Sequence, residues 1–171
     1  MQRLLKILYT IILFIVSLVV QLFVFNNMDL FGVKPNILFI SCIVVGLYTN
    51  IYASTIYSFL LGFVVDLIFG STGMFTISYT AIGMLVGFIG ENYMKENYFS
   101  IIILTALSVT LFEVVQYIQS MIIISEFISF FFLLKQLILS ILLNVILTFI
   151  LCFTFGKIME YIDKKQNKIY W

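Results

Sequence analysis

Long apolar runs separated by short polar connectors dominate this chain. Apolar and polar positions do not alternate within the runs, as they do in the strands of a membrane β-barrel. A helix rises about 1.5 Å per residue, so most of the runs are long enough to cross a hydrocarbon core of roughly 30 Å. The pattern predicts one integral membrane domain with six spanning helices, over residues 7–25, 36–49, 52–69, 74–90, 99–120 and 137–156.

The connectors refine this division of the chain. Pro35 suits the first turn of the second helix, where its missing N–H costs nothing. Gly70 to Gly73 predicts a tight connection between the third and fourth helices. Residues 125–136 (SEFISFFFLLKQ) are apolar but too short to cross alone, so they either lie on the membrane or extend the sixth helix. The first run exceeds the apolar region of a signal peptide, and no cleavage site follows it, which predicts a membrane helix.

Composition supports an all-α polytopic membrane protein. Apolar residues make up 63% of the chain, charged residues make up 10%, and the mean hydropathy is +1.20, which excludes a soluble globular domain. The net charge of +1 gives no reason to expect nucleic-acid binding. Histidine is absent, and Cys42 and Cys152 are isolated in apolar runs, so we expect no metal or other cofactor.

Basic residues predict the orientation of the six helices. Under this topology seven of the nine fall on the side of the two termini: Arg3, Lys6, Lys95, Lys157, Lys164, Lys165 and Lys168. Positive charge marks cytoplasmic loops, so both termini are expected in the cytoplasm. The basic tail has two interpretations: attraction to anionic lipid or to the acidic face of a filament, or, as the favoured one, a plain topology anchor.

Small residues recur at three- and four-residue steps along the third and fourth helices. Such stripes let helix backbones approach closely in lipid. We therefore expect these two helices to form a tight hairpin, with five glycines in its packing: Gly62, Gly70, Gly73, Gly83 and Gly87.

Two acidic residues, Asp66 and Glu113, lie inside apolar runs, in the outer half of the membrane under the predicted topology. Carboxylates in spans are costly and indicate a structural or functional role. Asp66 either contacts a partner or caps the turn that opens the fourth helix, and its nearness to that turn favours the cap. Glu113 has no basic residue within the spans to pair with. It is therefore either protonated or paired with a cation on another chain.

Polar residues also form stripes on the fifth and sixth helices. Gln116 follows Glu113 on the fifth helix, and Asn144 lies in a four-residue repeat on the sixth. These side chains either hydrogen-bond across neighbouring helices or line an outward cavity for a substrate or a partner's side chain. Whether such a cavity holds a ligand stays open. Because we find no nucleophile–base arrangement and no phosphate loop, we do not expect an enzyme.

The length, the six-run hydropathy and one segment resemble the MreD family of bacterial rod-shape-determining proteins. The segment is Gly62-Phe63-x-x-Asp66-Leu67-x-x-Gly70-x-x-Gly73, which is similar to the family's glycine-flanked "DL..G" segment. Lys34-Pro35-Asn36 resembles the "PD" opening of the second span, with Asn36 where Asp is common. The resemblance covers essentially the whole chain, although its motifs are short.

This resemblance implies a multi-pass scaffold of the cytoplasmic (inner) membrane, acting in cell shape and lateral peptidoglycan synthesis. The implied partners are a bitopic MreC-type protein and the wall glycosyltransferase and transpeptidase of the elongation complex. An actin-like filament is linked indirectly. The family has no established activity, so no catalytic residue carries over.

The family is also similar in fold to the substrate-binding membrane subunits of energy-coupling-factor vitamin transporters, which supplies an alternative function. Those subunits usually carry an Ala-x-x-x-Ala seam in the first helix. The first helix here contains no alanine, which favours the scaffold.

Overall fold

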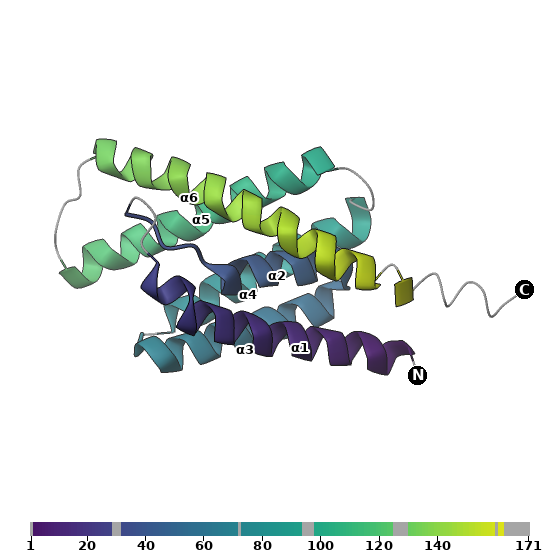
Figure 1. Cartoon of the computed structure of the whole chain (residues 1–171). Coiled ribbons are helices and arrows are strands. Elements are labelled where there is room, and N and C mark those ends of the chain that lie inside the picture. The colour runs from purple at the N-terminus through teal and green to yellow at the C-terminus, as the bar shows by residue number, and fades with distance from the viewer. Residues whose placement is uncertain are drawn as a thin grey trace, which may run out of the picture.

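The computed structural model describes residues 2–28, 32–71, 73–93, 98–124, 130–159 and 161–162. In this part of the chain all long elements are helices, arranged as one bundle (Figure 1). They are α1 (Gln2–Phe23), α2 (Ile37–Tyr48), α3 (Ile51–Phe69), α4 (Met74–Tyr93), α5 (Tyr98–Ile124) and α6 (Phe130–Leu151), with a short 3-10 helix η1 (Phe25–Asn27) and a π-helical segment η2 (Cys152–Gly156). Five of these six α-helices are long and apolar enough to cross a membrane, and α2 is the shorter one. The predicted all-α polytopic class is confirmed.

Several helix boundaries differ from the predicted spans, because no residue there breaks the helix. α1 begins at Gln2, five residues before the predicted start at 7. α5 continues through apolar residues to Ile124, beyond the predicted end at residue 120. α6 begins at Phe130, seven residues before the predicted start at 137. Residues 130–136 therefore extend α6, which decides between the two interpretations of this part of the segment. Residues 125–129 and the basic tail from Lys164 lie outside the described residues.

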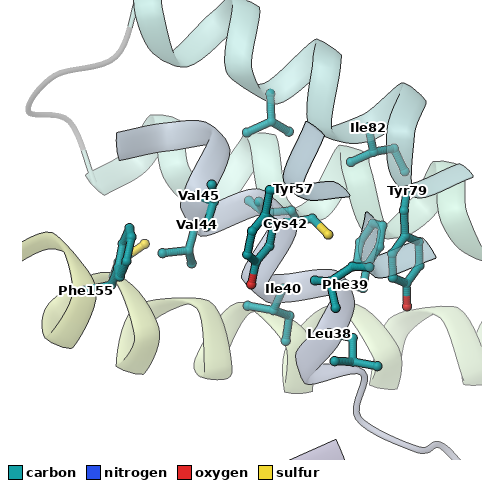
Figure 2. Packing of buried hydrophobic residues seen from close by; sticks show 14 of the residues in the cluster. Leu38, Phe39, Ile40, Cys42, Val44, Val45, Tyr57, Tyr79, Ile82 and Phe155 are labelled. Atoms are coloured by element: carbon teal, nitrogen blue, oxygen red, sulfur yellow. The ribbon is translucent and has the colours of Figure 1, made fainter. Parts of the chain in front are cut away.

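The shortest helix, α2, forms the centre of the bundle. Every residue from Ile37 to Gly46 is buried, and α2 contacts α1, α3, α4, α5 and α6. Figure 2 shows its side chains packed against Tyr57 of α3, Tyr79 of α4 and Phe155 of η2. A helix enclosed on all sides by other helices can be apolar around its whole circumference, as this one is.

At 12 residues, α2 is about 18 Å long and cannot cross the bilayer by itself. The residues just before it, 34–36, are not helical, and backbone groups at membrane depth must be bonded inside the protein. Gln21 of α1 meets this need: its Nε2 donates to the Pro35 carbonyl (3.3 Å), and its Oε1 accepts from the Ile37 N–H (2.9 Å). Asn36 is the N-cap and accepts from the Phe39 N–H (3.0 Å). The prediction that Pro35 lies in the first turn is therefore wrong, because the helix begins two residues later.

The start of α1 and the end of α6 lie at the same end of the bundle (Figure 1). The short link between α2 and α3 is at that end too, whereas α3 turns into α4 at the opposite end. This arrangement agrees with the alternation assumed in the predicted topology. Together with the bias of basic residues in the sequence, it predicts that the end where α1 starts and α6 ends faces the cytoplasm.

A reporter enzyme that is active only outside the cytoplasm tests this orientation. Fused after Trp171 it should be silent, because the last helix returns to the cytoplasmic side. Inserted between Ser71 and Thr72, in the α3–α4 connection, it should be active. A cytoplasmic reporter such as a fluorescent protein that requires cytoplasmic folding serves as the matched control and should give the inverse pattern. An active reporter after Trp171 would contradict the assignment.

Candidate functional site

The α3–α4 hairpin is packed at backbone distance, as the small-residue stripes predict. A Cβ atom at Gly62 would lie 2.6 Å from the Thr76 Cα, and one at Gly87 would lie 3.0 Å from the Ile51 Cα. Gly83 likewise faces Ser58 across the seam. Ser54 of α3 donates from its hydroxyl to the Gly83 carbonyl (2.7 Å).

Gly70 and Gly73 have a different role from the predicted packing role. A Cβ at either position would meet nothing within 4 Å, so these glycines do not provide a close approach. Their φ angles are +63° and +87°, in the region that glycine adopts without steric cost. Gly70 is the C-cap of α3, and both residues shape the turn.

Asp66 lies in the last turn of α3 and is 7% exposed. Its carboxylate accepts four hydrogen bonds. The Phe75 N–H donates to Oδ1 (3.2 Å) and the Thr76 N–H to Oδ2 (2.7 Å), and the hydroxyls of Ser71 and Thr76 add one bond to each oxygen. Phe75 and Thr76 belong to the first turn of α4, whose N–H groups have no partner within the helix. Asp66 is therefore a cap for the following helix, as predicted.

Glu91 makes the reciprocal contact at the other end of the hairpin, a contact not predicted from the sequence pattern. Its Oε2 accepts from the N–H of Ile51, the first residue of α3 (3.2 Å). Asn50 caps the same end by accepting from the Ala53 N–H (3.0 Å). Each helix of the hairpin thus supplies an acid to the N-terminus of the other, where negative charge is favourable.

Glu113 lies in α5 and starts a polar chain that runs down α6. The Ser140 hydroxyl donates to Glu113 Oε1 (2.5 Å), and Asn144 Nδ2 donates to the Ser140 hydroxyl (3.1 Å). The Thr148 hydroxyl donates to the backbone carbonyl of Asn144 (2.8 Å). Ser140, Asn144 and Thr148 are buried. The predicted stripe on the sixth helix therefore contacts α5 at Ser140, whereas Asn144 and Thr148 hydrogen-bond within α6.

A pocket of about 440 Å³ opens beside this chain, between α5 and α6. Its walls combine five polar residues with four apolar ones: Glu113, Gln116, Tyr117, Ser120, Gln136, Val114, Leu133, Leu134 and Leu137. Two of the four candidate residues, Glu113 and Gln116, are thus in one pocket. Asn144 touches the same network but does not line the pocket, and Asp66 bonds only to the α3–α4 turn and the start of α4.

One polar atom in the pocket wall, Gln116 Nε2, is buried without a hydrogen-bond partner among the described residues. Gln119 Oε1 on α5 and Asn144 Oδ1 on α6 are also without one, but neither residue lines the pocket. Gln116 and Asn144 are among the residues predicted from the sequence, whereas Gln119 is not, because a lone glutamine outside a regular stripe gives only a weak signal. Buried polar atoms normally find partners, so the pocket that contains Glu113 and Gln116 is a candidate binding site.

Neither cysteine is in these sites. Cys42 and Cys152 are both free and buried in the hydrophobic core, as their apolar surroundings in the sequence predict. Among the described residues no group of three or more His, Cys, Asp or Glu side chains is arranged to hold a metal ion.

Comparison with protein families identifies the chain. The model of the rod shape-determining protein MreD matches residues 1–158, nearly the whole sequence. Comparison of this chain with curated proteins and with solved structures found no match. With the apolar helices of the bundle, the family match indicates a multi-pass protein of the bacterial inner membrane. This chain belongs to the MreD family of rod shape-determining proteins.

Proposed function

We propose that this protein is a membrane scaffold of the bacterial cell-elongation machinery, supporting lateral peptidoglycan synthesis without a catalytic step of its own. The observation that carries the proposal is the family match over residues 1–158. A scaffold needs helix surfaces that a neighbour can cover, and a buried core that holds its own helices together.

The bundle has both properties. Its core around α2 is filled, with Ile40, Ile43 and Val44 fully buried. By contrast, only 11% of the membrane-spanning stretch of α1 is buried inside the protein, against 39% of that of α3. Apolar side chains therefore project outward along α1, ready for lipid or for a membrane helix of another subunit.

The proposed partners are a bitopic MreC-type protein and the wall glycosyltransferase and transpeptidase of the elongation complex. The actin-like filament is reached through them rather than by direct contact. Anionic lipid is the proposed neighbour of the basic tail from Lys164. The absence of alanine from the first helix favours this scaffold over a transporter subunit that carries a vitamin.

Two linked measurements test the proposal. In a rod-shaped bacterium depleted of its own MreD, the full-length chain together with its cognate MreC-type protein should restore rod shape. Its tagged form, captured from native membranes, should bring the MreC-type protein and the wall synthases. The untagged chain, taken through the same capture, is the control. Rounded cells despite normal membrane insertion, or capture of an ATPase-coupled transport module instead of wall proteins, would overturn the scaffold.

A further inference from the structure

We infer that the α5–α6 pocket receives a Lys or Arg side chain from a membrane helix of a partner subunit, with Glu113 as its counter-ion. This inference rests on the proposed scaffold function and names the chemistry of one of its contacts. The pocket is defined by the nine residues given above, on the outer halves of α5 and α6.

The Glu113 carboxyl group has no basic partner among the described residues. Among the described residues its hydrogen-bond partner is Ser140, and no ion pair involves it. Asp66, in contrast, accepts four hydrogen bonds at the end of its helix. Lys135 is on α6 but is exposed and does not line the pocket. A carboxylate inside the membrane needs a partner, and the described part of the chain supplies one neutral donor, the Ser140 hydroxyl.

Four polar residues share the pocket with Glu113. Gln116, Gln136, Tyr117 and Ser120 line it, and each has an oxygen atom that accepts hydrogen bonds. The unpartnered Gln116 Nε2 is a donor, and a half-turn of that amide puts Oε1 in its place. An ammonium or guanidinium group has three or five N–H donors and no acceptor. A basic side chain therefore fits a pocket that combines one carboxylate with several neutral acceptors.

The pocket is reached from the side of the bundle that faces lipid. Val114 is 46% exposed and Leu134 is 41% exposed, and both line the pocket. In a membrane such side chains face lipid, so the pocket opens sideways into the bilayer. Its volume of about 440 Å³ accepts side chains but not a helix, which is roughly 10–12 Å wide. The donor helix must lie along the opening and insert a side chain.

Depth distinguishes a protein helix from a lipid headgroup as the source of the cation. Glu113 lies 11 residues before Ile124, the last residue of α5, which is about 16 Å along the helix axis. Lipid amines reside at the interface, outside the hydrocarbon core. A cation at the depth of Glu113 is therefore carried by a residue of another membrane helix.

Photo-crosslinking in native membranes tests the inference on the full-length protein. A photoreactive residue at Leu134, on the edge of the pocket, should capture one protein whose crosslinked membrane helix carries a Lys or Arg. Glu113→Gln should lower that yield about tenfold, because a bond to a charged partner is replaced by a neutral one. The same photoreactive residue at Leu107, exposed on α5 away from the pocket, is the matched control, and its products should not respond to Glu113→Gln.

Charge exchange then separates pairing from mere proximity. Glu113→Lys should abolish the Leu134 product, and a Glu in place of the partner's basic residue should restore it. Detergent melting of Glu113→Gln at the wild-type temperature shows that a loss is not due to unfolding. A captured helix without a basic residue, a lipid adduct alone, or an unchanged yield with Glu113→Gln would overturn the inference. If the unaltered chain restores rod shape and captures wall proteins while any of these results holds, the scaffold stands and only the pocket assignment fails.

Discussion

Asp66→Ala should lower the free energy of unfolding by about 3 kcal/mol, since hydrogen bonds to a charged group contribute about 1.5–3 kcal/mol and the donors left behind add a desolvation cost. The carboxylate is the acceptor for the Phe75 and Thr76 N–H groups and for two hydroxyls. Alanine removes the acceptor of all four donors, which lie in the α3–α4 turn and at the start of α4. SDS-induced unfolding in detergent micelles, followed by helical circular dichroism, measures the change.

Asp66→Asn is the informative second variant. From the sequence we expect asparagine to be nearly silent, because it caps helices about as well as aspartate. The geometry changes that expectation. Each carboxylate oxygen accepts from one backbone N–H, and an amide has an NH₂ group in place of one oxygen. One N–H would then face another donor, so we expect a loss of about 1.5 kcal/mol, half that of alanine.

Glu91→Gln is the matched control, because it makes the same carboxylate-to-amide exchange at the other end of the hairpin. Glu91 is exposed and accepts one backbone bond, so its loss should stay within about 0.5 kcal/mol. Wild-type stability of Asp66→Ala would show that the cap contributes nothing. Equal losses for Asp66→Ala and Asp66→Asn would show instead that the negative charge, not the number of acceptors, stabilises the turn.

Much of the bundle follows from the sequence because the membrane restricts the choices. An apolar run in lipid must satisfy its own backbone, which leaves a helix for runs without alternation. The stripe of Gly62, Gly83 and Gly87 predicted the α3–α4 seam, since few other residues allow contact at backbone distance. The position of Asp66 beside a glycine turn predicted its cap.

The central position of α2 was not predictable from hydropathy. An apolar helix gives the same signal whether lipid or protein surrounds it, so residues 36–49 were predicted to span, whereas the helix there has 12 residues and is too short to do so alone. Gln21 gave a similar weak signal, because a single glutamine does not reveal which backbone it bonds. Its contacts to Pro35 and Ile37 depend on how α1 packs against α2, which is a tertiary property.

The site between α5 and α6 was predicted in part. A four-residue polar repeat placed Ser140 and Asn144 on one face of α6, and that face meets Glu113. The repeat does not say how far apart two helices lie. The pocket exists because α5 and α6 leave space beside Gln116 and Gln136, and sequence spacing contains no information on that separation.

Gly62→Ala should lower the free energy of unfolding by about 3 kcal/mol, although alanine is the better helix former by about 1 kcal/mol. The added Cβ would lie 2.6 Å from the Thr76 Cα and 2.8 Å from the Phe75 carbonyl oxygen. Both are backbone atoms, so no rotamer change relieves the clash and α4 must move away from α3. Overpacking costs about 1–3 kcal/mol, and the shift also strains the bonds from Phe75 and Thr76 to Asp66.

Coupling to Asp66 is the sharpest test of this account, again by SDS-induced unfolding in micelles. Because Gly62→Ala disturbs the same hydrogen bonds that Asp66→Asn weakens, the double variant should lose at least about 0.5 kcal/mol less than the two single losses together. Ala81→Val, at an exposed position of α4, adds bulk where no helix is in the way and should stay within about 0.5 kcal/mol of wild type. Full additivity would mean that the Gly62 contact and the Asp66 cap act independently, and wild-type stability of Gly62→Ala would mean that α3 and α4 do not pack at backbone distance.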